Sequence, residues 1–344
     1  MKTFFIANWR PEGGIWKLDF DPETEKIISV CKAADGQNTA YFETQEDILY
    51  VLSEIGGPGK LAGRIESFRM SETGLTKLDE ITGIPSGAPH LKLGNHGKTM
   101  YVASYATGAV CSVDVDAGRF GQITSLLDYE GHSIVPERQE SPHAHMFCET
   151  PDGGYMVCVD LGTDELRVYA IEEDGCLKEH HVVKTPAGYG PRHMVFSKDG
   201  RYAYVVCELQ YHLLSYRYLG EGQMELVSDL KVIEDLPEDQ NWGGAIKISS
   251  DGDRLYISNR GTKLSSIDTI SLKDPASPER KGTFPDCAHP RDYLFFEAAG
   301  KEYLLCLNMT TEITALYAFD PLTNTYRFLD QTNEIPMPVC AAVL

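Results

Sequence analysis

One pattern recurs along the chain at intervals close to 50 residues. Five copies have a Pro or Gly, a short apolar strand, a glycine-containing turn, an aromatic strand and a polar break before a third strand, and a weaker copy begins at Asn38. The copies begin at residues 38, 89, 142, 191, 244 and 290, so they are separated by 51, 53, 49, 53 and 46 residues. Self-similarity at a fixed period indicates a repeat architecture, in which each copy is one structural unit.

Short strands joined by Asp-Gly turns at this period predict an all-β fold, a β-propeller with four-stranded blades. One further period begins at Pro338 and holds a single strand. The missing strands of that blade are found at the other end of the chain, over Thr3–Asn8 and Gly14–Phe20. We therefore predict one domain over residues 1–344, a seven-bladed β-propeller whose N- and C-terminal strands share the closing blade and leave no open sheet edge.

Charge and cysteine usage narrow the function classes. The chain has 31 basic and 51 acidic residues, a formal net charge of −20, which repels phosphate backbones and anionic lipids, so we expect no nucleic acid and no membrane partner. The N-terminal apolar stretch ends at Asn8, too early for a signal-peptide core. Nine cysteines without a Cys-x-x-Cys pair, most of them inside apolar runs, predict buried, reduced thiols in a cytoplasmic protein.

Strand direction within a blade predicts which residues share one face of the disc. Because antiparallel strands alternate in direction, each innermost strand begins on the face where the second strand ends. The residues at the starts of the innermost strands are Thr39, His90, His143, Arg192, Ala245, Arg291 and Val339. Those at the ends of the second strands are Asn8, Glu54, Tyr105, Asp160, Glu208, Asn259 with Arg260, and Asn308. This gathering of arginines and histidines favours an anionic small molecule as ligand; the alternative is a solvated polar lining that binds nothing.

His143 and His145 are two residues apart, so on a strand both side chains are expected to point into the channel. This spacing suits a metal ligand pair, a general base, an anion-binding group or a structural role. A metal site needs at least a third protein ligand, and the other candidates, His90 and His193, belong to other blades. We therefore expect no metal and no cofactor.

Five segments carry a resemblance to a known family. They are Ser141–His145, Asp160–Asp164, Gly188–Phe196, Tyr202–Leu209 and Asn259–Gly261. With these segments the sequence resembles the seven-bladed lactonase family, which includes propeller-type 6-phosphogluconolactonases and fungal carboxymuconate-lactonizing enzymes. The similarity covers essentially the whole chain and is most specific over residues 141–261. It implies a cleft at the channel mouth, with candidate catalytic groups at His143, Arg192, Glu208 and Arg260.

The first hypothesis is a metal-independent lactone hydrolase acting on 6-phospho-D-glucono-1,5-lactone, within carbohydrate metabolism and the pentose phosphate pathway. Ester hydrolysis needs a base that activates water and cations that stabilise the oxyanion. His143 would take the proton, with Glu208 orienting the water or sharing that role, and Arg192 with Arg260 would stabilise the oxyanion. The candidate substrate-binding residues are His90, His145, Arg291 and Asp160, of which Arg291 and His90 would hold the phosphate.

Two alternatives stay open: cycloisomerisation of a carboxylated muconate, and a non-catalytic propeller that binds a partner at an outer blade edge. For the enzymatic hypotheses the partner is a small anionic sugar lactone or carboxylate, and we expect a monomer or weak homo-oligomer. Arg192 and Glu208 should lie side by side at one end of a hairpin, with Arg260 across a gap suited to a small ligand. Arg192→Lys should then cut turnover at least tenfold and barely change stability.

Overall fold

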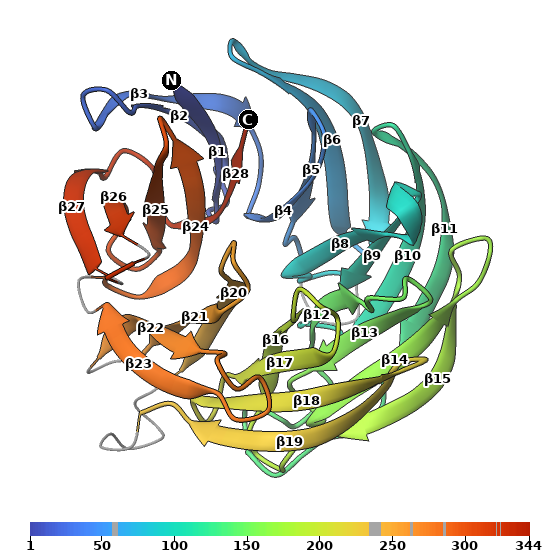
Figure 1. Ribbon diagram of the computed structural model, residues 1–344. Coiled ribbons are helices and arrows are strands. Elements are labelled where there is room, and N and C mark those ends of the chain that lie inside the picture. The colour runs from blue at the N-terminus through green and yellow to red at the C-terminus, as the bar shows by residue number, and fades with distance from the viewer. Residues whose placement is uncertain (57–60, 234–241, 262–263, 285–286, 321, 324) are drawn as a thin grey trace.

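The computed structural model describes all residues except 57–60, 234–241, 262–263, 285–286, 321 and 324. In this part of the chain, 28 strands form seven four-stranded antiparallel sheets, which surround a central channel (Figure 1). The seven-bladed β-propeller predicted from the repeat is confirmed. The remaining regular element of the described residues is a single 3-10 turn, η1 (Asn95–Gly97).

Each blade has an innermost strand at the channel and three strands that follow outward. The innermost strands are β4 (Thr39–Gln45), β8 (His90–Gly94), β12 (Ala144–Glu149), β16 (Pro191–Phe196), β20 (Gly243–Ile248), β24 (Pro290–Ala298) and β28 (Pro338–Val343). The second strands are β1 (Lys2–Asn8), β5 (Ile48–Ser53), β9 (Thr99–Ala103), β13 (Tyr155–Asp160), β17 (Tyr202–Cys207), β21 (Arg254–Arg260) and β25 (Lys301–Asn308). The third strands are β2 (Gly14–Asp21), β6 (Gly63–Ser71), β10 (Ala109–Asp116), β14 (Glu165–Ile171), β18 (His212–Gly220), β22 (Ser265–Ser271) and β26 (Ile313–Asp320). The outer strands are β3 (Lys26–Asp35), β7 (Gly74–Ile84), β11 (Arg119–Asp128), β15 (Leu177–Lys184), β19 (Gln223–Lys231), β23 (Glu279–Phe284) and β27 (Thr325–Thr332).

The closing blade joins the two ends of the chain in the strand order β28-β1-β2-β3. β28 pairs antiparallel with β1, so that Phe4 lies opposite Val343 and Ala7 opposite Cys340. Both termini consequently lie in the same blade (Figure 1). The predicted sharing of this blade is confirmed, and backbone hydrogen bonds between distant parts of the sequence close the ring.

Every blade is buried on both of its faces, which explains the continuous apolar runs in the second strands. Side chains alternate along β1: Phe4 and Ile6 pack against the β24–β27 blade, and Phe5 and Ala7 pack against the β4–β7 blade. Seven such apolar clusters occur among the described residues, one between each pair of neighbouring blades. Hydrophobic burial therefore stabilises the contacts between blades, and a single blade would leave both of its faces exposed.

Three consecutive blades share one design at the hairpin between their first and second strands. In each, a hydroxyl donates a hydrogen bond to the aspartate two residues later, and a glycine with positive φ follows that aspartate. The pairs are Thr150–Asp152 (2.6 Å), Ser197–Asp199 (2.7 Å) and Ser249–Asp251 (2.5 Å). Hydrogen bonds from Ser197 and the Arg201 amide lower the pKa of Asp199 to about 2. The Asp-Gly turns expected from the sequence are thus confirmed in these blades.

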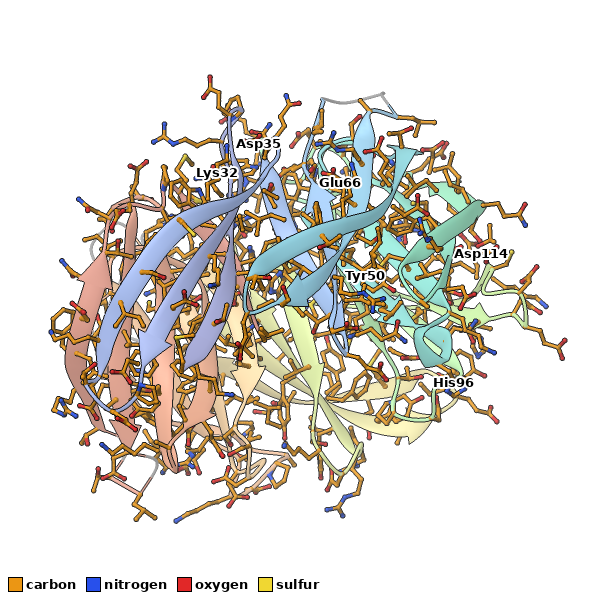
Figure 2. The ribbon with its side chains drawn as sticks, turned by 90° about the horizontal axis from the view of Figure 1, so that it is seen from above. Lys32, Asp35, Tyr50, Glu66, His96 and Asp114 are labelled. Atoms are coloured by element: carbon orange, nitrogen blue, oxygen red, sulfur yellow. The ribbon has the colours of Figure 1, made fainter. Side chains whose placement is uncertain are left out.

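The two faces of the disc carry different parts of each blade. We call the face at which the innermost strands begin the start face, and the face with the hairpins between first and second strands the turn face. Figure 2 shows the disc from the side, with Asp35, at the end of β3, near the upper edge and His96, in η1, near the lower edge. The links between blades lie at the start face, and the one that follows Asp35 leads from β3 to β4. η1 joins β8 to β9 and lies on the turn face.

Asp268 on β22 connects two blades through a buried hydrogen-bond network. Its carboxylate is fully buried and accepts hydrogen bonds from Tyr211 of the preceding blade (3.0 Å) and from Arg280 (2.8 Å) and Thr283 (2.6 Å) on β23. Asp268→Ala should lower the free energy of unfolding by about 1–3 kcal/mol, because it removes the buried acceptor that Tyr211, Arg280 and Thr283 share. Calorimetric unfolding measures this. Asp116→Ala, at an exposed position, should change it by less than about 0.5 kcal/mol, and equal losses in the two variants would contradict the assignment.

Candidate functional site

β-bulges at the starts of the innermost strands decide which side chains reach the channel. The strand register shifts there in six blades; only β8 pairs without a shift. The residues inside the bulges are Ala40, His145, Arg192, Gly244 with Ala245, Arg291 and Val339. A bulged residue is left out of the hydrogen-bond ladder and its side chain is re-aimed. This is how His145, Arg192 and Arg291 from three blades come to line one small cavity of about 20 Å³.

Glu208, which follows β17, is the centre of a cluster of arginines on the start face. Its Oε2 lies 2.9 Å from Arg192 Nε and 2.6 Å from Arg260 Nη2. Arg138 Nη2 donates a hydrogen bond to the other oxygen, Oε1. One carboxylate is therefore shared by three guanidinium groups, which leaves the cluster with an excess of positive charge.

Backbone carbonyls fix the two inner arginines. Arg192 also donates to Gly244 O (2.8 Å), and Arg260 donates to Gly243 O (2.8 Å); both residues are at least 95% buried. Arg192 and Glu208 lie side by side as predicted. The expected gap between Arg260 and this pair was wrong, because Arg260 contacts the same carboxylate oxygen directly.

The pKa shifts of Glu208 and Arg192 show that this cluster has too little negative charge for its arginines. Burial alone would raise the pKa of Glu208, but Arg260, Arg192 and Arg138 outweigh it and hold that pKa well below its usual range. Burial, together with the charges of Arg260 and Arg291, lowers the pKa of Arg192. Since arginine remains protonated in proteins, this lowering reflects first the cost of burying the Arg192 charge and then its repulsion from Arg260 and Arg291, and an anionic ligand would relieve that repulsion.

His143 has one ring nitrogen fixed and the other directed toward a carboxylate. Its Nδ1 lies 2.7 Å from Tyr105 O, and because a carbonyl accepts, Nδ1 carries the hydrogen in the neutral ring. The ring stacks on Tyr105 with centroids 4.2 Å apart. Nε2 therefore presents a lone pair, and Glu140 Oε1 lies 3.6 Å from it. This is the geometry of a general base with an oriented tautomer.

Several predicted ring residues hold the links between blades and do not line the mouth. Asp160 is fully buried, and its Oδ1 accepts hydrogen bonds from the His143 amide (2.8 Å) and the Gly162 amide (2.9 Å). Asn259 and Asn308 bond link amides of their own blades in the same way. The expectation of direct substrate contact by Asp160 does not fit this burial; Asp160 fixes the position of His143.

Three imidazoles form a layer inside the channel, and two of them, His90 and His145, are buried. The ring centroids of His145 and His193 are 5.0 Å apart, and those of His193 and His90 are 5.8 Å apart. Burial first, and Arg192 with other cations after it, lowers the pKa of each imidazole well below its usual range, so that these rings are neutral. His145 Nδ1 has no hydrogen-bond partner among the described residues.

His90 lies apart from the arginine cluster. Its ring packs on Tyr41, and it lines the larger hollow toward the turn face, whereas the small cavity between Arg192 and Arg291 does not include it. The expected pairing of a charged His90 with Arg291 around a phosphate is therefore not formed. His90 is neutral and faces the other end of the channel.

Arg291 is the arginine of the mouth that has no close counter-charge. Within the described ranges, no carboxylate lies within ion-pair distance of it. The charge of Arg291 acts on the carboxyl group of Glu54 from a longer distance. Burial raises the pKa of Glu54, and the positive charge of Arg291 opposes this rise. Arg291 is thus available to an anionic group of a ligand.

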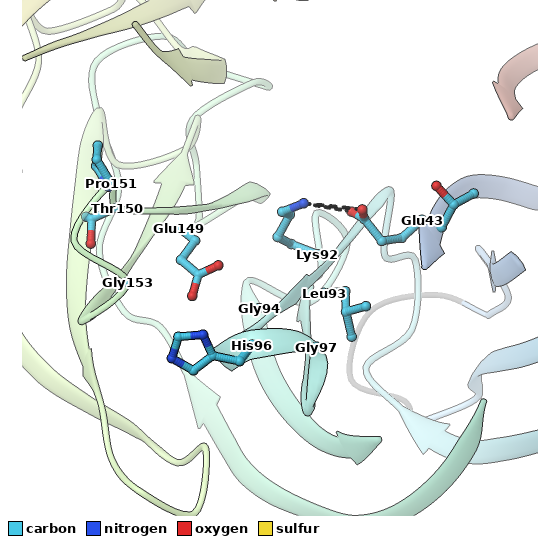
Figure 3. Close-up of a pocket in the computed structure, with 11 residues that line it drawn as sticks. Glu43, Lys92, Leu93, Gly94, His96, Gly97, Glu149, Thr150, Pro151 and Gly153 are labelled. Carbon is cyan, nitrogen blue, oxygen red and sulfur yellow. Dashed lines mark hydrogen bonds and ion pairs between the residues drawn. The ribbon is translucent and has the colours of Figure 1, made fainter. Parts of the chain in front are cut away.

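The opposite end of the channel has a different character. A hollow of about 540 Å³ opens toward the turn face, and a second one adjoins it at Glu43 and Lys92 (Figure 3). Lys92 pairs with Glu43 at 3.2 Å, and Lys247 pairs with Asp292 at 3.1 Å. Because these cations already have carboxylate partners, the excess of positive charge in the channel lies at the start face.

Three further findings concern the described residues. No three His, Cys, Asp or Glu side chains among them are arranged to hold a metal ion. All nine cysteines lie among the described residues and form no disulfide; six are buried, and Cys31 is exposed. No described helix has the length and apolar character required to span a membrane.

A family model described as lactonase, 7-bladed beta-propeller, matches residues 5–343. The chain belongs to this family. The resemblance noted in the sequence is therefore confirmed over nearly the whole chain.

Individual relatives extend along the full length. The 6-phosphogluconolactonase of Bacillus subtilis (strain 168) is 29% identical over 338 residues, covering 96% of this chain and 94% of that protein. The uncharacterized protein SSP0869 of Staphylococcus saprophyticus is 28% identical and covers 99% of both. Among solved structures, the periplasmic gluconolactonase PpgL of Pseudomonas aeruginosa superposes with a TM-score of 0.89 at 24% identity, covering 100% of this chain and 99% of that one. The likeness to PpgL shows the shared fold.

Two site residues of this lactonase-family chain, Arg138 and Glu140, were not found by sequence reasoning. Both belong to the link between β11 and β12, residues 129–143, the longest of the fully described links between blades. All such links lie at the start face. The unusual length of this link was therefore the sequence feature that could have pointed to Arg138 and Glu140. A long link at that face has to lie over or beside the mouth.

Removing the shared carboxylate tests the electrostatic description. Glu208→Gln keeps the shape of the side chain but leaves three arginines without their common counter-charge. We expect the free energy of unfolding at neutral pH to fall by about 3–5 kcal/mol. Denaturant unfolding measures the loss, and Glu12→Gln at an exposed position serves as the control.

The pH dependence of that loss has a defined sign. A carboxylate with a lowered folded-state pKa stabilises the fold fully above its unfolded pKa, about 4.3, and this contribution is lost as the pH falls through the folded pKa. The difference between wild type and Glu208→Gln should therefore be constant above about pH 5 and shrink in more acidic solution. A difference that shrinks between pH 7 and 5 would contradict the low pKa of Glu208.

Proposed function

We propose that this protein hydrolyses lactones and that its substrate is 6-phospho-D-glucono-1,5-lactone. The observation that carries the proposal is the pairing, at one mouth of the channel, of an oriented histidine base with an arginine cluster in excess over its carboxylate. Membership of the lactonase family and the name of the Bacillus subtilis relative support the reaction class. In this proposal the protein acts on a small anionic lactone in the cytoplasm, as a monomer or weak homo-oligomer, without nucleic acid or membrane.

His143 is the proposed base. Its Nε2 takes a proton from a water molecule whose oxygen attacks the lactone carbonyl carbon. Glu140, at 3.6 Å from Nε2, then stabilises the imidazolium that forms. When the ring C–O bond breaks, the proton passes from the imidazolium to the leaving oxygen, which gives the hydroxy acid.

Glu208 orients groups in this mechanism and does not accept the proton. A carboxylate whose pKa is held well below its usual range is a weak base at neutral pH. It keeps Arg192 and Arg260 in place, and these provide a preorganised positive potential for the oxyanion. Such preorganised stabilisation is typically worth about 3 kcal/mol per positioned donor. Arg291 has no close carboxylate among the described residues and is the proposed anchor for the phosphate.

The rate of phospholactone hydrolysis, measured against its spontaneous rate, tests the reaction. His143→Gln should reduce the catalysed rate by about 10²–10⁴, the usual contribution of a general base. His180→Gln, at an exposed position on β15, should retain the wild-type rate. A rate with pure protein equal to the spontaneous one would overturn the proposal.

The same variants separate the other hypotheses. Turnover of carboxymuconate without hydrolysis of the phospholactone would identify a cycloisomerase. If neither substrate reacts, and a binding partner is bound equally by wild type and by His143→Gln, the protein is a binding module.

Arg192→Lys tests the geometry of the arginine site. Lysine keeps the charge but loses the planar fork that reaches Glu208 and Gly244 O together. We expect at least a tenfold fall in kcat/KM, or about 1.4 kcal/mol. Because Arg192 is 2% exposed, we now also expect a lower unfolding temperature, unlike the unchanged stability expected from the sequence. Wild-type activity in this variant would show that net charge alone is required.

A further inference from the structure

The two oxygens of Glu208 have partners of different kinds. Oε2 is held by Arg192 and Arg260, whose side chains are 2% and 6% exposed. Oε1 is held by Arg138, whose side chain is 32% exposed. The carboxylate is therefore fixed on its inner side and covered on its outer side by an arginine that solvent reaches.

Arg138 is held by side chains alone, whereas the inner arginines are also held by the backbone. Arg192 and Arg260 each donate to a backbone carbonyl in addition to Glu208. Arg138 contacts the Glu208 carboxylate and the Tyr105 phenol, which are both side chains. Its guanidinium can change partners without leaving a buried carbonyl unsatisfied.

The backbone beside Arg138 is firmly anchored. Gln139 is fully buried and donates from Nε2 to Leu161 O at 2.8 Å. Ser133, at the other side of the link, donates to Asp164 Oδ2 at 2.6 Å, and its amide donates to Gln139 O at 2.9 Å. The link therefore presents the Arg138 side chain at a fixed point beside Tyr105, whose ring stacks on His143.

We propose that Arg138 is a specificity residue for anionic substrates: it moves from Glu208 Oε1 to the anionic group of an incoming lactone and holds that group together with Arg291. The movement gives the ligand a two-pronged donor at the rim and leaves Oε1 open to accept a hydrogen bond from a ligand hydroxyl. The inner arginines keep Glu208 ionised and in place during this exchange. A neutral lactone offers Arg138 no anionic acceptor that could compete with the Glu208 carboxylate, so Oε1 stays covered. This assignment rests on the proposed lactonase function and deepens it by naming the residue that selects the charge of the substrate.

A matched pair of substrates tests it: 6-phospho-D-glucono-1,5-lactone and the neutral D-glucono-1,5-lactone. We expect Arg138→Gln to reduce kcat/KM for the phospholactone by about 10- to 100-fold, mainly through KM, as for loss of a charged hydrogen bond. For the neutral lactone the change should stay within about threefold. Arg119→Gln is the control, because Arg119 is an arginine in the β10–β11 hairpin that donates to Leu78 O, remote from the arginine cluster. Equal losses on the two lactones would overturn the specificity role and leave Arg138 a structural residue.

Binding of the product separates this inference from the proposed function. Calorimetry with 6-phosphogluconate and with gluconate requires no turnover. If wild type binds 6-phosphogluconate more tightly than gluconate, and Arg138→Gln loses that preference, the role of Arg138 stands even when no lactone is hydrolysed. If Arg138→Gln still prefers 6-phosphogluconate to gluconate, the specificity role of Arg138 is contradicted. The proposed hydrolase activity is not affected by that result.

A second variant, Arg138→Lys, distinguishes loss of the charge from a general disturbance of the fold. Arg138→Lys keeps the charge at the rim and should give a smaller loss on the phospholactone than Arg138→Gln, with the neutral lactone unaffected. Equal losses on the two lactones in both Arg138→Gln and Arg138→Lys would indicate a purely structural effect.

Discussion

Hydrogen bonding between the two ends of the chain, β28 with β1, is the constraint on which the other features of this protein depend. Each blade buries both faces, so no blade can complete its core until it has a neighbour on each side. The ring meets that requirement only when it closes. Closure also brings seven innermost strands to one axis, which places side chains more than 100 residues apart in sequence around a single opening.

The bulges make this opening chemically useful. A regular ladder would send alternate side chains of the innermost strands into the cores between blades. The register shifts release one or two residues in six blades, and in three of these the released side chain is His145, Arg192 or Arg291. In the other three blades the released residues are alanine, glycine or valine. The large polar side chains released into the channel therefore come from three of the blades, and the blade that releases Gly244 and Ala245 lies between those of Arg192 and Arg291.

Burying several arginines around one carboxylate opposes stability. A protein with a net charge of −20 has many carboxylates, yet only Glu208 enters the cluster that contains Arg138, Arg192 and Arg260. Each desolvated guanidinium costs free energy that the shared carboxylate and the backbone carbonyls only partly offset. Such an arrangement is expected where a bound anion completes the balance, and this is the physical basis for assigning an anionic ligand to the start face and not to the internally paired lysines of the turn face.

The sequence by itself determined the fold, because the period and the apolar strands are local properties that the repeat displays six times, and three of the copies add an Asp-Gly turn. It also determined that Arg192 and Glu208 meet, since a hairpin of known length fixes their separation. Tertiary structure alone decided the rest. The direct contact of Arg260 with Glu208, the neutral state of His90 and the burial of Asp160 all depend on bulge positions, on the depth of each side chain in the channel and on the path of the link 129–143. These are properties of how blades converge on an axis, and no residue spacing within one blade encodes them.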